Sequence, residues 1–194
     1  LSPVENKVWE RLAERPLELE TLYRNEREQA QAAAVMVRKG MVIYSGFTPS
    51  DAAHVLGFSS HWSTEAAHLA AVIWAKQMRY VYGWGNFDPC DSTAVSQVVH
   101  DRVVSTICET VIKACMATGD PWKQTAVFDK INRLLTEWIM DDGTIDGGLF
   151  AVNFDPDRSL VAVGAPASFY YPTAGRMLGI GLKIPKHGDV ANAI

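Results

Sequence analysis

The sequence predicts a helix-rich α/β fold, with a start like that of a winged helix and a C-terminal βαβα unit. Apolar residues recur at helical spacing through most of residues 1–145, whereas two short continuous apolar runs near the C-terminus are typical of covered parallel strands. The 194 residues are 48% hydrophobic, enough for one sizeable core or two small ones. We therefore expect three segments: a winged-helix-like segment over 1–57, a helical layer over 58–145 and an α/β unit over 146–194.

The sequence of the first segment predicts three short helices followed by a strand. Ser2 followed by Pro3 is a favoured helix start, and Pro16 ends that helix before a second short one. An alanine-rich third helix over 26–38 ends before Gly40, and residues 41–44 are expected to form a strand. The charges on the third helix are mixed, which favours a structural role for this outline over DNA binding.

The helical layer opens with a recognisable cap. Thr48 followed by Pro49 and Asp51 predicts a capping box, and Gly57 ends the short helix that follows. Longer helices are expected over 62–81, 92–117 and 127–139. The apolar stripe of the second of these is predicted to consist of Val95, Val98, Val99, Val103, Ile107, Val111, Ile112 and Cys115.

The α/β unit contains the first candidate site. Strands are expected at 160–163 and 182–185, with a helix over 172–178 between them and another helix beginning at Asp189. In open α/β sheets, ligands bind outside the carboxyl ends of strands. This rule selects the turns that follow the two strands, which are Gly164-Ala165-Pro166 and Lys186-His187-Gly188-Asp189.

The second turn contains a histidine and an aspartate on either side of a glycine. His187 and Asp189 could act as an acid/base pair, as metal ligands or as hydrogen-bonding partners of a ligand, and Asp189 is equally well explained as the cap of the last helix. An ordinary turn is the structural alternative at Gly164.

Charge and cysteine content exclude several classes of function. The formal net charge of −4 gives no overall attraction to nucleic acid or anionic lipid, and no window is apolar enough to cross a membrane. We expect a soluble, cytoplasmic protein with neither as its partner. Cys90, Cys108 and Cys115 lack disulfide or zinc spacing, and we expect the last two to be buried apolar residues.

Two stretches together resemble the hydantoinase A / 5-oxoprolinase family. Residues 44–57 read Y-S-G-F-T-P-S-D-A-A-H-V-L-G, and residues 187–194 read H-G-D-V-A-N-A-I after the Gly164-Ala165-Pro166 turn. Members are ATP-dependent enzymes that open cyclic amides, and they are related to acetone and acetophenone carboxylase subunits. The resemblance covers residues 40–194, and residues 1–39 fit the family's preceding helices.

The resemblance implies an actin-like ATPase fold, in which two lobes hold ATP with Mg²⁺. Each lobe of such proteins opens with an acidic, glycine-rich turn of the D-x-G-G-T type, which this sequence does not contain. We therefore expect an excised later part of the catalytic region, inactive by itself, from a parent that binds ATP and Mg²⁺. The implied partners are a cyclic amide substrate and a hydantoinase B-type subunit or domain.

The resemblance also implies roles for individual residues. Gly164, Ala165 and Pro166 match the turn on the adenosine side of the nucleotide, with Ala165 in place of the usual second glycine. His187, Asp189 and Asn192 match a family segment whose polar groups face the cleft between the lobes. His54 belongs to the first motif, and its role is left open. Thr48 and Asp51 of the same motif are expected to have structural roles. No catalytic base is identified.

Two alternatives stay open. The chain could be a non-catalytic interaction module that docks a partner subunit, in which case its long helices should expose excess apolar area. A metal site formed by His54, His187 and Asp189 would require these three side chains to lie within a few ångström of one another.

Overall fold

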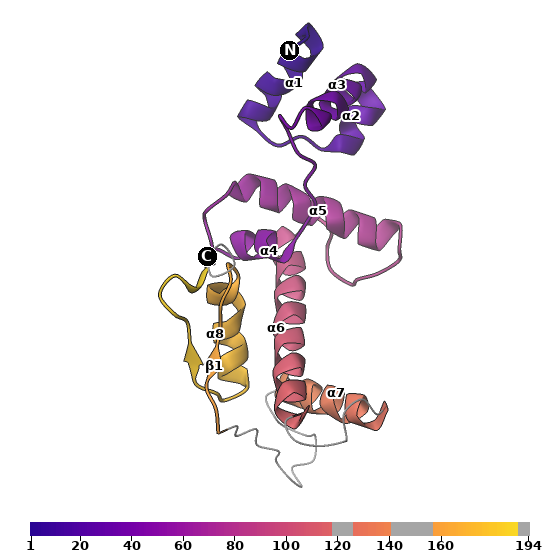
Figure 1. The fold of residues 1–194 in the computed structure, drawn as a ribbon. Helices are drawn as coiled ribbons and strands as arrows, with labels where there is room; N and C mark the ends of the chain where they lie inside the picture. Colours follow the sequence, from indigo (N-terminus) through magenta and orange to yellow (C-terminus); the bar gives the residue numbers. More distant parts are fainter. Residues whose placement is uncertain (118–125, 141–156, 190–194) are drawn as a thin grey trace. The chain divides into compact units, whose positions relative to one another are not determined.

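The computed structural model describes residues 1–117, 126–140 and 157–189 (Figure 1). It divides the chain into two compact units, Leu1–Gln97 and Val98–Ile194, rather than into the three expected segments. Helix α4 of the expected first segment packs on α5 of the second, so both belong to one unit. The described residues form eight helices and a two-stranded parallel sheet, a helix-rich α/β fold. None of these helices combines the length and the apolarity needed to span a membrane.

The first unit begins with a three-helix cluster, formed by α1 (Pro3–Glu14), α2 (Leu19–Asn25) and α3 (Arg27–Arg38). Helix α1 begins at the expected cap, where Ser2 and Glu5 form a capping box. Lys39 donates a 2.6 Å hydrogen bond to Glu5, and this bond lowers the pKa of the Glu5 carboxyl. The core of the cluster consists of Val8, Ala32, Ala33 and Met36.

The prediction of a strand at residues 41–44 is wrong. The chain leaves α3 through Gly40 at φ 69°, and the Met41 N–H bonds to the Met36 carbonyl, which closes the helix C-terminus. The run beyond pairs with no described strand, and Ile43 is 84% exposed. Without a partner ladder, the β propensity of these residues is not realised, so the winged-helix outline lacks its wing.

The remainder of the first unit is built on α4 (Pro49–Val55) and α5 (Thr64–Tyr80). The expected Thr48–Asp51 capping box opens α4, and Gly57 at φ 76° ends it. Helix α5 begins after the Ser63 cap, and its buried alanines pack with Val95 and with an aromatic group. That group consists of Phe47, Trp74 and Phe87.

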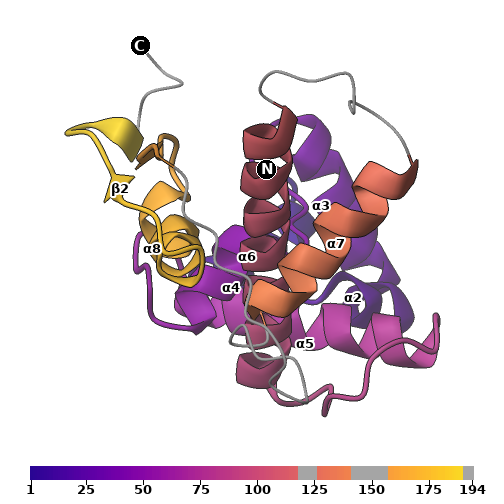
Figure 2. The same ribbon diagram turned by 90° about the horizontal axis from the view of Figure 1, so that it is seen from below.

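Helix α6 (Ser92–Ala117) crosses the boundary between the units and supplies much of the second core. Its residues Val104, Cys108 and Ile112 pack against Tyr170, Ala174 and Leu178 of α8 (Ala167–Met177). The predicted stripe is therefore partly wrong, because Val98 and Cys115 are exposed. The remaining helix is α7 (Ala126–Met140), which crosses α6 (Figure 2).

The sheet pairs β1 (Leu160–Val161) with β2 (Leu182–Lys183) in parallel, in the expected places but shorter than expected. Helix α8 begins at Ala167 rather than at Pro172, which lies inside it. An interior proline costs about 3 kcal/mol in an exposed helix. Here the burial of Tyr170 and Ala174 on α6 favours helix on both sides of the proline. The prediction of a helix beginning at Asp189 concerns residues 190–194, which lie outside the described residues.

Candidate functional site

The two predicted turns meet at one edge of the sheet, which we call the carboxyl edge: residues 164–166 after β1 and 186–189 after β2. The parallel pairing continues through the bond from the Ala162 N–H to the Lys183 carbonyl, at 3.0 Å. Beyond it, the Gly164 N–H donates to the Gly188 carbonyl at 2.6 Å. A direct backbone hydrogen bond therefore joins the two turns that the sequence selected.

Both glycines at this bond are buried and conformationally restricted. Gly164 has φ 103°, a region that side chains disfavour. A Cβ on Gly188 would lie 3.3 Å from Pro185 Cδ and 3.6 Å from the Ala162 carbonyl oxygen. The preceding His187 adopts φ 64°, an uncommon conformation for a residue other than glycine, and it turns the chain so that Gly188 reaches Gly164.

The carboxyl edge presents exposed side chains, and some of its backbone amides are used in bonds within the turns. The N–H of Gly188 bonds to the Pro185 carbonyl, that of Ala167 bonds to the Gly164 carbonyl, and Pro166 has no N–H. The exposed residues of the edge are Ala165, Pro166, Lys186, His187 and Asp189. The edge therefore combines small apolar surface with an ammonium, an imidazole and a carboxylate, which are groups that can contact a base or a sugar.

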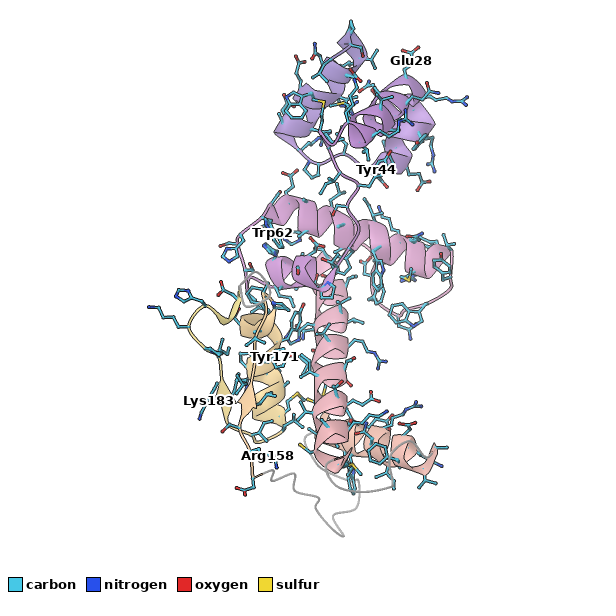
Figure 3. The ribbon with its side chains drawn as sticks, viewed as in Figure 1. Glu28, Tyr44, Trp62, Arg158, Tyr171 and Lys183 are labelled. Atoms are coloured by element: carbon cyan, nitrogen blue, oxygen red, sulfur yellow. The ribbon has the colours of Figure 1, made fainter. Side chains whose placement is uncertain are left out.

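His54 has a structural environment. It is 3% exposed, its Nδ1 lies 2.7 Å from the Ser50 carbonyl, and its Nε2 accepts the Trp62 N–H at 3.2 Å. The imidazole also stacks on the Trp62 ring, with centroids 5.2 Å apart (Figure 3 labels Trp62). Nδ1 is thus engaged within α4 and Nε2 with the connection between α4 and α5, so the geometry gives His54 no nitrogen to offer to a ligand.

The expected site residues thus fall into three groups. Gly164, Ala165, Pro166, His187 and Asp189 come together at the carboxyl edge. His54 lies in the α4–α5 connection, and Asn192 lies outside the described residues. Within the described ranges, no three His, Cys, Asp or Glu side chains are grouped as a metal ion requires, so the metal alternative receives no support.

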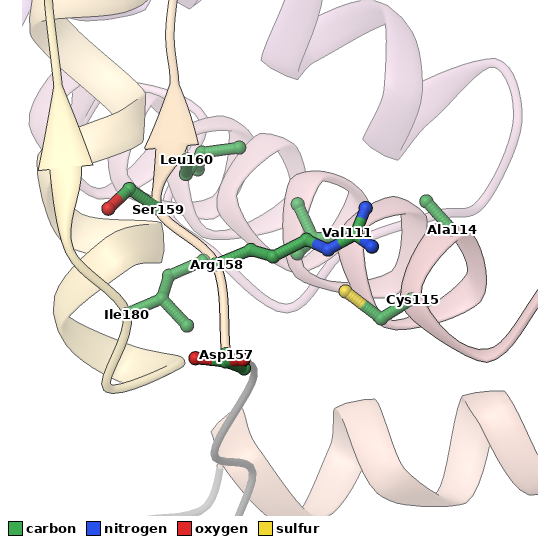
Figure 4. Close-up of a pocket in the computed structure, with 8 residues that line it drawn as sticks. All are labelled: Val111, Ala114, Cys115, Asp157, Arg158, Ser159, Leu160 and Ile180. Atoms are coloured by element: carbon green, nitrogen blue, oxygen red, sulfur yellow. The ribbon is translucent and has the colours of Figure 1, made fainter. Parts of the chain in front are cut away.

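The sequence did not point to a cavity of about 410 Å³ at the opposite end of β1 (Figure 4). Arg158 extends across it towards α6, where Cys115 lines the wall. The other lining residues are Val111, Ala114, Asp157, Ser159, Leu160 and Ile180. A mainly aliphatic wall with an arginine suits a small apolar anion. No motif signals it, because its residues come from three separate segments of the chain.

A second missed contact links α5 to the start of α6. His68 Nδ1 lies 2.7 Å from the Ser92 hydroxyl oxygen. Asp91 caps the same helix start, because its carboxylate accepts the N–H groups of Thr93 and Ala94. The spacing of 24 residues between His68 and Ser92 hides this pair from a motif search.

No protein-family model, no curated protein and no solved structure matches the chain.

Proposed function

We propose that this chain is part of an ATP-dependent hydrolase that opens cyclic amides of the hydantoin or 5-oxoproline type. The proposal starts from the resemblance of residues 44–57, 164–166 and 187–194 to the hydantoinase A / 5-oxoprolinase family. The observation that carries it furthest is the 2.6 Å bond between Gly164 and Gly188, since it joins two parts of that pattern at the edge where α/β sheets bind ligands.

The proposed ligand at the carboxyl edge is the adenosine part of ATP. Ala165 and Pro166 offer small apolar surface for the base, and His187 and Asp189 offer hydrogen-bonding groups for a sugar. The resemblance matches this edge to the adenosine side of the nucleotide and not to its phosphates. We therefore assign the phosphates and Mg²⁺ to the acidic, glycine-rich turns that actin-like ATPases have and this sequence lacks.

In the parent, ATP supplies the phosphoryl group that converts the poor leaving oxygen of the amide into a phosphate. The residues of this chain bind and orient the nucleotide, and buried Gly164 and Gly188 fix the spacing between the two turns. The general base and the ring pocket are assigned to the remainder of the parent or to a hydantoinase B-type partner.

The proposal is tested by phosphate release from ATP in the complete parent with its partner subunit. We expect hydantoin or 5-oxoproline to stimulate release, and Gly164→Ala to lower kcat/KM for ATP by about tenfold or more because the turn is displaced. Gly179→Ala is the matched control, since Gly179 also has a positive φ, of 65°, but lies at the other end of α8. An equal loss of kcat/KM for ATP in the two variants would contradict the proposal. So would a rate of phosphate release that cyclic amides do not change.

A non-catalytic interaction module is the second candidate. The end of α5 and the residues that follow it expose aromatic and apolar side chains, as a surface that docks on another protein would. Tyr80, Val81, Tyr82 and Trp84 are each at least 50% exposed. This candidate is favoured if the parent binds its partner subunit but no nucleotide.

A further inference from the structure

Helix α7 buries two polar side chains beside its apolar contacts and leaves other apolar side chains exposed. Asn132 and Thr136 are 0% and 3% exposed, and the Asn132 side-chain amide donates to the Glu109 carbonyl of α6 at 3.2 Å. By contrast, Val127, Ile131 and Leu134 are 59%, 42% and 54% exposed. Packing on α6 therefore leaves much of the apolar surface of this helix open to solvent.

The exposed residues form a continuous stripe. Val127, Ile131, Leu134 and half-buried Trp138 follow one another at intervals of four, three and four residues, the spacing of a coiled-coil seam. We call these four residues the α7 stripe. At about 100° per residue, they lie within a narrow sector of the helix, beside the sector of Phe128 and Asn132 that is buried.

The charges beside the stripe indicate what could cover it. In two antiparallel copies, Ile131 lies opposite Leu134 of the other copy, and Val127 lies opposite Trp138. The same register places exposed Lys130 opposite exposed Glu137, and the two-fold axis repeats this pair of opposite charges. A parallel arrangement brings no such opposite charges together.

We propose that the α7 stripe binds the α7 stripe of a second copy of this chain, antiparallel and across a two-fold axis. The inference is independent of the proposed enzyme activity. A 15-residue helix is about 22 Å long, so the contact is smaller than the about 1,200 Å² of stable interfaces. We therefore expect a weak dimer that dissociates on dilution.

Sedimentation velocity on the 194-residue protein, from about 5 to about 500 μM, tests this inference by mass action. Reversing one charge, Lys130→Glu or Glu137→Lys, sets like charges against each other twice and should raise the dimer dissociation constant about tenfold. The double variant Lys130→Glu/Glu137→Lys restores opposite charges and should return the dissociation constant to that of the original protein.

The substitution Leu134→Lys tests the apolar contact between the two α7 stripes. We expect no dimer at the highest concentration, with unchanged helix content by circular dichroism, because Leu134 is 54% exposed. A protein that is monomeric throughout the range would overturn the proposal and leave the stripe to a different partner. A dimer unaffected by Leu134→Lys, or single charge reversals that the double variant fails to rescue, would overturn it too.

Discussion

At the scale of single residues, the three cysteines differ in environment. Cys108 is fully buried between α6 and α8, whereas Cys90 and Cys115 are exposed. Burial raises the pKa of the Cys108 thiol from 9.0 to about 11, because the thiolate is poorly solvated in an apolar core. Cys108 therefore acts as a small apolar residue at neutral pH.

This difference predicts selective thiol labelling. At pH 8, Cys108 should react at least about 100-fold more slowly than Cys90 or Cys115, because it has less thiolate and less access to the reagent. The measurement compares reaction rates in native and urea-unfolded protein, with Cys90→Ser/Cys115→Ser as the variant that leaves Cys108 alone. Native labelling of that variant at the rate of the unfolded protein would contradict the burial.

The raised pKa of Cys108 also makes the free energy of unfolding depend on pH. Below pH 9.0 the thiol is protonated whether the chain is folded or unfolded, so its stabilising effect is fully present. Between 9.0 and about 11 only the folded protein keeps the proton, and the free energy of unfolding should fall as pH rises through this window. Cys108→Ala should weaken that fall in urea unfolding measured at pH 8 and pH 10.

Residue-level predictions from sequence succeeded where the cause is local. The Thr48–Asp51 box was predictable because its partners are three residues apart, and the Thr48 N–H donates to Asp51 at 2.8 Å. The exposure of Cys115 was not predictable. Val104, Cys108 and Ile112 face α8, and that choice of buried face depends on packing rather than on composition.

At the scale of elements, His54 ties two helices together through the α4–α5 connection. His54→Ala removes the acceptor of the Trp62 N–H and the stacking partner of its ring. We expect the free energy of unfolding to fall by about 2 kcal/mol. Urea unfolding followed by tryptophan fluorescence measures it.

His61→Ala is the matched control, because His61 is exposed in the same connection. It should change the free energy of unfolding by less than about 0.5 kcal/mol. Equal effects of the two substitutions would contradict the structural role of His54.

Element boundaries show the limits of sequence reasoning. Helix α6 begins at the predicted Ser92, since Asp91 caps its start. The strand at 41–44 was not, because a strand exists only where a partner pairs with it, and α3 closes instead through Gly40. At Pro172 the opposite error occurred: tertiary burial on α6 outweighed a local signal for a helix start.

At the scale of the whole molecule, the sequence placed the ends of the two strands at one edge of a sheet, whereas it did not reveal the division into two units. Two strand ends far apart in the chain were expected at one edge, and a backbone bond joins Gly164 to Gly188 there. The division into two units depends on α4 packing against α5, which periodicity does not reveal. The cavity beside Arg158 escaped prediction for a similar reason, because α6 and β1 form it together.

The central claim is that the carboxyl edge is the adenosine side of an ATP site whose phosphate-binding turns belong to the parent. Calorimetric titration with Mg-ATP tests it, applied to the 194-residue protein and to a longer version that adds the glycine-rich lobe. We expect saturable binding by the longer protein, a loss of at least about tenfold in affinity on Gly164→Ala, and no detectable heat from the 194-residue protein. The absence of binding heat in both proteins would contradict this assignment of the carboxyl edge. So would tight binding of Mg-ATP that Gly164→Ala leaves unchanged.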